Sequence, residues 1–239
     1  MNFKGKCAFI TGVSHGIGQA IALHLAKDGA DLFLCDINED GLKNTAKKSM
    51  EYGVKVEYAV LDVSNEQAVN QTAKDAIGKM GKIDILINNA GIYNTYVAFS
   101  NSNSEDWRKK IEINLLGTMY LTRALINHMI DNNYGRIINI GSVAGVYGIA
   151  NMVDYSVSKG AVISFSRSLA KEAAQYNITV NTVSPGSISI NGEQLPNHSF
   201  MGRAGTVDEC ANVVVFLASD EASYVSGQNY IVDGCRKKL

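Results

Sequence analysis

Short apolar runs alternate with segments of helical periodicity along this 239-residue chain, and this alternation constrains its fold more than any other feature. We expect strands at 6–11, 31–35, 54–61, 83–87, 136–140, 178–183 and 230–232. We expect helices at 17–28, 38–51, 66–80, 105–131 (as one or two helices), 153–175 and 207–218. Because several strands are almost continuously apolar, they are expected to be buried on both faces. The pattern predicts an α/β fold, with a doubly wound parallel sheet of about seven strands between two layers of helices.

Composition narrows the class of protein further. A length of 239 residues suits one domain, so residues 1–239 are expected to form a single unit. A net charge of −1 argues against nucleic-acid binding, and no apolar run approaches the roughly 20 residues that cross a bilayer. Residues 1–6 do not resemble a secretory signal. Four scattered cysteines without a Cys-x-x-Cys pair indicate reduced thiols in the cytoplasm and no metal site.

A glycine-rich turn, TGVSHGIG at 11–18, stands between the first expected strand and the first expected helix. Gly12, Gly16 and Gly18 allow a tight turn, and the free N–H groups of a helix start suit a pyrophosphate. Asp36 ends the second strand, where a carboxylate accepts hydrogen bonds from ribose hydroxyls and disfavours a 2′-phosphate. This combination predicts NAD rather than NADP. The competing interpretations are a plain turn for the glycines and a helix N-cap or loop carboxylate for Asp36.

Two further strand ends carry small or polar residues that suit a flat ligand. Asp62 and Val63 follow the third strand, at the next position along the same edge. The fourth strand ends in Asn88-Asn89-Ala90-Gly91, where small residues let a ring or a ribose lie against the sheet. These positions extend the predicted cofactor site.

Tyr155 and Lys159 are four residues apart at the start of a long expected helix, so they share one face. Oxidation of a secondary alcohol needs a base, and tyrosine needs a nearby cation to act at neutral pH. Lys159 can supply that charge, and Ser142, directly after the fifth strand, can hydrogen-bond the substrate oxygen. Asn114 is expected to open another long helix. A lone Tyr-x-x-x-Lys pattern is weak support, so the argument depends on this set occurring together.

The order of these motifs resembles the classical short-chain dehydrogenase/reductase family over essentially the whole chain. The resemblance is carried by residues 11–18, Asp62-Val63, NNAG at 88–91, Asn114 in INLLGT, Ser142 in INIGSVAG, YSVSK at 155–159, Pro185-Gly186 and the segment 216–234.

The family resemblance implies a Rossmann-type three-layer α/β/α sandwich that includes the catalytic site. It implies a catalytic tetrad of Asn114, Ser142, Tyr155 and Lys159, in which Asn114 holds a water that relays protons to Lys159. It also implies a nicotinamide cofactor that is oriented in part by the backbone of Ile188. The predicted cofactor-binding residues are Gly12, Ser14, His15, Gly16, Ile17, Gly18, Asp36, Asp62, Val63, Asn89, Ala90, Gly91, Tyr155, Lys159, Pro185, Gly186 and Ile188.

Three departures from the family pattern stand near the C-terminus. Ile190 replaces a threonine that contacts the cofactor in relatives, and Ser187 or Ser189 could substitute for it. Residues 187–205, expected to form the substrate lid, are short for this family. Cys235 stands where a second glycine commonly follows Asp-Gly.

The resemblance leaves several activities open. We rank NAD-dependent interconversion of a secondary alcohol and its ketone first, with a polyol, sugar, hydroxysteroid or hydroxy acid as substrate. The alternative is a 3-oxoacyl-acyl-carrier-protein reductase, but Asn133 and Tyr176 replace basic residues that often grip the carrier, and His15 replaces an arginine often seen in NADP users. A non-catalytic NAD-binding sensor is disfavoured by the complete tetrad. The segments 93–99, 143–152 and 187–200 are expected to shape the substrate pocket.

The two longest helical segments, 114–131 and 153–175, carry apolar residues on more than one face. Family resemblance implies that these helices pair across a two-fold axis and that the C-terminal strand packs across another. Two such axes generate a D₂ homotetramer. The alternative is that the additional apolar residues fill contacts within one chain, which would leave a monomer.

Overall fold

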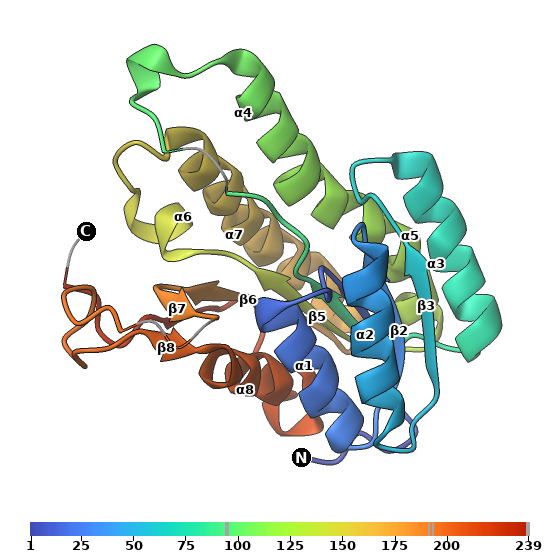
Figure 1. Cartoon of the computed structure of the whole chain (residues 1–239). Coiled ribbons are helices and arrows are strands. Elements are labelled where there is room, and N and C mark those ends of the chain that lie inside the picture. Colours follow the sequence, from blue (N-terminus) through green and yellow to red (C-terminus); the bar gives the residue numbers. More distant parts are fainter. Residues whose placement is uncertain (94–95, 191, 193, 238–239) are drawn as a thin grey trace.

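The computed structural model describes residues 1–93, 96–190, 192 and 194–237. Within these residues, seven parallel strands form one sheet in the order β3-β2-β1-β4-β5-β6-β9 (Figure 1). They are β1 (Cys7–Thr11), β2 (Asp31–Asp36), β3 (Val56–Val60), β4 (Ile85–Asn88), β5 (Gly135–Ile140), β6 (Ile178–Pro185) and β9 (Asn229–Val232). The predicted doubly wound sheet is confirmed. Its strand order reverses between β1 and β4, where such sheets bind ligands at their carboxyl edge.

Helices cover both faces of the sheet. On one face α1 (Gly16–Lys27), α2 (Glu39–Met50) and α8 (Val207–Ala218) share a core with alternate strand residues such as Ala8 and Ile10. On the other face α3 (Glu66–Met80), α5 (Gly117–Asp131) and α7 (Val153–Ala173) pack on the remaining residues, including Phe9. This alternation explains why the strands are apolar at nearly every position. No helix within the described ranges is long and apolar enough to cross a membrane.

Helix starts differ in how their free N–H groups are satisfied. The side chains of Asn38 and Asn65 accept a backbone N–H at the starts of α2 and α3, and Thr206 forms a capping box with Glu209 at α8. His15 precedes α1 without a side-chain cap, and the first turn of α1 has no acidic residue. The N–H groups at the start of α1 therefore remain available for another acceptor.

The expected helix at 105–131 is divided into three parts. It comprises α4 (Ser104–Lys110), a π-helical segment Ile111–Leu116 and α5. The short elements that were not predicted include α6 (Val143–Tyr147) and the strand pair β7 (Ile188–Ser189) and β8 (Gly205–Thr206). Apolar periodicity does not distinguish a π-helical turn from an α-helical one, and elements of two to five residues carry too few positions to show a period.

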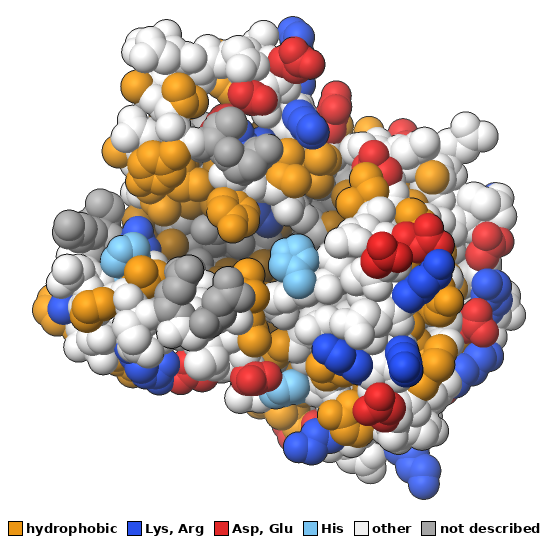
Figure 2. Space-filling view, viewed as in Figure 1, with side chains coloured by type: hydrophobic (Ala, Val, Ile, Leu, Met, Phe, Trp, Pro, Cys, Tyr) orange, Lys and Arg blue, Asp and Glu red, His pale blue; other side chains and the backbone are white. Residues whose placement is uncertain are grey.

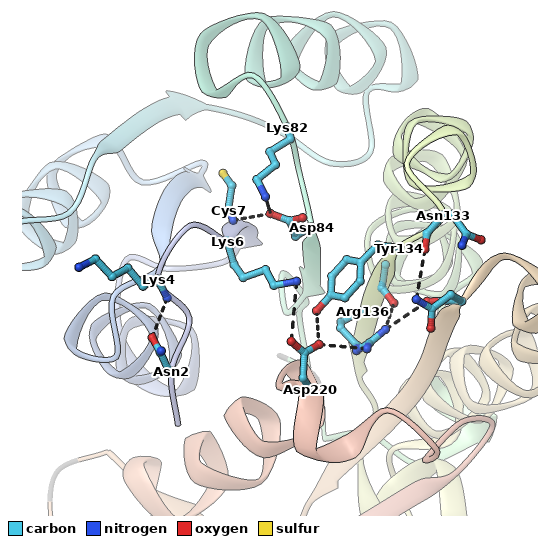
Figure 3. A network of polar contacts seen from close by, with 12 residues as sticks. Asn2, Lys4, Lys6, Cys7, Lys82, Asp84, Asn133, Tyr134, Arg136 and Asp220 are labelled. Atoms are coloured by element: carbon cyan, nitrogen blue, oxygen red, sulfur yellow. Dashed lines mark hydrogen bonds and ion pairs between the residues drawn. The ribbon is translucent and has the colours of Figure 1, made fainter.

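A polar network near the amino ends of the strands connects β5 to the C-terminal part of the chain (Figure 3). The Asp220 carboxylate accepts hydrogen bonds from the Tyr134 hydroxyl at 2.8 Å and from the Arg136 guanidinium at 3.2 Å. Arg136 also donates to the carbonyl oxygens of Gly135 and Asn177, and Lys6 lies 3.8 Å from Asp220. This network lies at the edge opposite to the predicted site.

Candidate active site

The glycine-rich turn is tightly packed. Gly12 and Gly16 have φ angles of +69° and +61°, a region that favours glycine. A Cβ atom on Gly18 would lie 2.0 Å from the Gly12 carbonyl oxygen, so no side chain fits there. Because the start of α1 has free N–H groups and no acidic residue, the turn fits an anionic phosphate group.

Asn89 holds the turn from the neighbouring strand β4. Its side-chain nitrogen donates to the carbonyl oxygens of Thr11 and Gly12, at 3.1 and 2.7 Å. The Thr11 hydroxyl in turn accepts the backbone N–H groups of Asn89 and Ala90. The Asn89 side chain therefore shapes the glycine-rich turn, and Ala90 and Gly91 line the edge of the sheet without bulky side chains.

Asp36 lies at the carboxyl end of β2 with both carboxylate oxygens engaged. One oxygen accepts the Ser14 N–H at 2.8 Å, and the other accepts the Asn38 N–H at 2.8 Å. Each oxygen retains a further lone pair, so the carboxylate can still accept a ribose hydroxyl. Ile37, which sequence reasoning overlooked, is 68% exposed beside it. No cation among the described residues forms an ion pair with Asp36.

The remaining predicted cofactor positions lie at the same edge in different environments. Asp62 accepts the backbone N–H and the hydroxyl of Ser64, which forms a tight turn after β3. Val63 is buried against Gly117, the first residue of α5. Pro185 ends β6, Gly186 donates its N–H to the Val232 carbonyl, and Ile188 begins β7.

Lys159 is buried on α7, and its ammonium donates to the Ile140 carbonyl oxygen at the end of β5, at 2.7 Å. Burial lowers the pKa of Lys159 to about 8. The ammonium would lie 3.3 Å from a Cβ on Gly91, so the absence of that side chain leaves room beside it. A close backbone approach between Gly145 of α6 and Gly160 places α7 against this edge.

Tyr155 lies one turn before Lys159, and Ser142 caps the start of α6. Burial raises the pKa of Tyr155, and a hydrogen bond with the Ser142 side chain works in the opposite direction. The Ser142 hydroxyl also accepts the Ala144 N–H at 3.1 Å, which fixes its position. The Tyr93 ring contacts the Tyr155 ring, with centroids 6.2 Å apart. The structure thus brings the side chains of Ser142 and Tyr155 into contact and places Lys159 one helical turn further along α7, beside the end of β5.

Asn114 does not open a helix, and that expectation was wrong. It lies inside the π-helical segment, where its side chain accepts the Ile92 N–H at 2.8 Å and donates to the Ile92 carbonyl and the Ser158 hydroxyl. The amide is therefore committed to protein partners. Sequence reasoning missed Ser158, although it stands directly before Lys159 in the YSVSK motif.

Within the expected lid segment, 187–205, residues 198–201 contact the C-terminal tail. Ser199 and Arg236 form an antiparallel bridge, and the Phe200 N–H donates to the Cys235 carbonyl. Cys235 has a φ angle of +59°, so it adopts the conformation that glycine takes readily. Ile190 lies 3.4 Å from the position of a Cβ on Gly16, over the glycine-rich turn. The positions 191 and 193 of this segment lie outside the described residues.

A family model described as Enoyl-(Acyl carrier protein) reductase matches residues 12–235. The 3-oxoacyl-(acyl-carrier-protein) reductase FabG of Thermotoga maritima is 37% identical, over 98% of each chain. A 2-dehydro-3-deoxy-L-rhamnonate dehydrogenase (NAD(+)) from a Sphingomonas strain is 36% identical, over 98% of this chain and 96% of that protein.

Solved structures show the same similarity. The crystal structure of an NAD⁺-bound xylitol dehydrogenase matches with a TM-score of 0.92 and 33% identity, over 98% of this chain and 100% of that one. That of the acetoin dehydrogenase YohF from Salmonella typhimurium has a TM-score of 0.91 and 34% identity, over 98% and 96% of the two chains. Together with the fold, these matches identify the chain as a member of the short-chain dehydrogenase/reductase family, an oxidoreductase that uses a nicotinamide cofactor on alcohol or keto groups.

Proposed function

We propose that this protein interconverts a secondary alcohol and its ketone with NAD(H), and that Tyr155 is the acid/base. The observation that carries the proposal is the group formed at the carboxyl edge of the sheet by the buried side chains of Ser142 and Lys159 and the half-buried side chain of Tyr155. The likeness to an NAD⁺-bound xylitol dehydrogenase, and to a rhamnonate-type dehydrogenase whose name specifies NAD(+), supports this choice.

In this mechanism each side chain has a separate task. The Ser142 hydroxyl hydrogen-bonds the substrate oxygen and stabilises negative charge that develops on it. The Tyr155 hydroxyl exchanges a proton with that oxygen, and the Lys159 ammonium favours the ionised form of Tyr155. Asn114 fixes the π-helical segment against α7 through Ser158; the water relay to Lys159 remains a prediction. The nicotinamide, when bound, supplies the hydride acceptor or donor.

The cofactor is held, in this proposal, by the predicted residues of the glycine-rich turn and the strand ends. The start of α1 binds the pyrophosphate, and Asp36 accepts the ribose hydroxyls and repels a 2′-phosphate. Asp36→Ala should therefore reduce kcat/KM for NAD about tenfold or more and narrow the preference over NADP. The measurement is kcat/KM for both cofactors. A wild-type kcat/KM that is higher for NADPH than for NADH would contradict the assignment.

Reduction of a 3-oxoacyl group on an acyl carrier is the second candidate, because FabG proteins are among the most similar relatives. Such a carrier is acidic, and the positions 133 and 176 hold Asn and Tyr in place of basic residues. The experiment compares initial rates on polyols, sugars, hydroxysteroids, hydroxy acids and a 3-oxoacyl thioester. Faster turnover of the thioester with NADPH than of every alcohol with NAD would favour the second candidate.

We also propose that the substrate enters beside the described parts of the expected lid segment, residues 187–190, 192 and 194–205. Figure 2 shows apolar side chains gathered around a hollow on this face of the molecule. Exposed apolar side chains from the expected pocket segments include Tyr93, Tyr147 and Phe200. Exposed apolar side chains in these segments favour, among the ranked substrates, those with apolar surface.

We further propose a homotetramer in the cytoplasm. Met119 is exposed on α5, while Phe165 and Leu169 are only half-buried on α7, so these helices retain apolar surface for a partner. The free cysteines fit a reducing compartment. Light scattering should give four times the protomer mass, and a mass near 25.8 kDa would contradict the assembly.

A further inference from the structure

A buried ion pair joins two helices beside the candidate active site. The Lys110 ammonium, at the end of α4, lies 2.6 Å from Oδ2 of Asp154, in the first turn of α7. The two side chains are 1% and 8% exposed. A buried ion pair loses so much hydration that an apolar pair of similar volume is often equally stable or more so. Stability alone is therefore a weak reason for these two residues.

The other oxygen of Asp154 binds the backbone of Tyr155. Oδ1 accepts the Tyr155 N–H at 2.8 Å. The first N–H groups of a helix have no partner within the helix, and Met152 provides no side-chain cap for α7. Asp154 thus satisfies the free N–H of the residue that carries the proposed acid/base, and Lys110 holds the carboxylate in place.

A second link holds the carbonyl group of the same residue. The Ser158 hydroxyl donates to the Tyr155 carbonyl oxygen at 2.8 Å and accepts from the Asn114 side chain at 3.0 Å. Lys110 directly precedes the π-helical segment that contains Asn114. The N–H and the carbonyl of Tyr155 are therefore both connected to one helical run, through Lys110 and Asn114.

We propose that Lys110 and Asp154 are positioning residues, which hold the first turn of α7 so that the Tyr155 hydroxyl stays aligned with Ser142 and Lys159. The inference rests on the proposed role of Tyr155. The pair touches neither substrate nor cofactor and acts through the Tyr155 backbone.

The test distinguishes two features of the pair: its opposite charges, and the Asp154 oxygen that accepts the Tyr155 N–H. In the double variant Lys110→Met/Asp154→Leu, both charges and the acceptor are removed. In Lys110→Met/Asp154→Asn, the charges are removed but the Asn oxygen can still accept the N–H. The first variant should lose about tenfold or more in kcat, because small displacements of reacting groups are costly. The second should recover part of that loss but stay below wild type, because the Asn oxygen can still accept the Tyr155 N–H while no ammonium holds that side chain in place. The Kd for NADH should change less than about twofold in both.

Lys43→Met is the matched control, because Lys43 forms an exposed ion pair with Glu39 on α2. It should leave kcat unchanged. Equal kcat values for the two double variants, with both folded, would overturn the proposal. If the apolar pair does not fold, Asp154→Asn and Asp154→Ala provide the same comparison, and equal kcat values would again overturn it.

Tyr155→Phe, measured in parallel, distinguishes the two possible failures. If Tyr155→Phe retains wild-type kcat, the proposed function fails and this inference fails with it. If Tyr155→Phe is inactive while Lys110→Met/Asp154→Leu keeps wild-type kcat, only the positioning role is wrong.

Discussion

Arg136 at the amino edge of the sheet and Lys159 at its carboxyl edge are both buried, but in opposite electrostatic surroundings. At the amino edge, Arg136 is 2% exposed and meets the Asp220 carboxylate, two carbonyl oxygens and the Tyr134 ring (Figure 3). At the carboxyl edge, Lys159 is 5% exposed and donates to the Ile140 carbonyl, and no carboxylate within the described ranges forms an ion pair with it. The Asp220 carboxylate balances the charge of Arg136. The charge of Lys159 has no such partner in the described part of the chain, so its burial opposes folding. Such groups concentrate at functional sites.

The same contrast separates two tyrosines. Burial raises the pKa of Tyr134, and a hydrogen bond to Asp220 raises it further. Burial also raises the pKa of Tyr155, but Ser142 works against that rise. The pKa of both tyrosines is raised by burial, and they differ in their hydrogen-bond partners: Asp220 favours the protonated form of Tyr134, whereas Ser142 favours the ionised form of Tyr155.

The largest predicted difference between the two edges is in kcat, when the tyrosine hydroxyl of each edge is removed in turn. Tyr155→Phe should reduce kcat by roughly 10²- to 10⁴-fold, as expected for loss of a general acid/base, with little change in NADH binding. Tyr134→Phe should leave kcat unchanged and destabilise folding by about 1 kcal/mol. Steady-state kinetics and denaturant unfolding of both variants check this. The contrast fails if Tyr155→Phe retains more than about a tenth of wild-type kcat.

A smaller effect on kcat is expected at the backbone contact between α6 and α7, the helix that carries Tyr155 and Lys159. A Cβ on Gly145 would lie 2.5 Å from the Gly160 nitrogen, so Gly145→Ala must push α6 away from α7. We expect kcat to fall about tenfold, because Lys159 and Ser142 would separate. Gly78→Ala is the control, since a Cβ there meets nothing within 4 Å on α3. Full activity of Gly145→Ala would show that this contact does not position the site.

The smallest effect is expected at the amino edge. Asp220→Asn should leave the Arg136 charge without its carboxylate and lower the free energy of unfolding by about 1 kcal/mol, because Asp220 itself is partly exposed. At temperatures below the unfolding transition of the variant, its kcat should equal that of the wild type. A fall in kcat would mean that the two edges are coupled, and would contradict the view that the amino edge affects only stability.

The fold was predictable because its signal is repeated along the chain. The strands β1, β2 and β4 are nearly continuous apolar runs, and the turn at 11–18 and the pair Tyr155–Lys159 each lie within one short segment of sequence. The contacts that build the site join residues that lie far apart in the sequence. Asn89 reaches Gly12 across 77 positions, and Lys110 reaches Asp154 across 44. The π-helical turn around Asn114 depends on packing against α7 through Ser158, which local periodicity cannot reveal.

The most direct test of the central claim is the pH dependence of stability for Lys159→Met. Lys159 has an ordinary pKa of 10.5 and a folded-state pKa of about 8, so proton binding favours the unfolded state. The wild type carries the full penalty below pH 8 and loses it as pH rises from 8 toward 10.5. Lys159→Met should therefore be inactive yet more stable at pH 7, by up to about 3 kcal/mol, with the difference shrinking toward pH 9.5. A variant that is less stable than wild type at pH 7, by an amount independent of pH, would contradict the account.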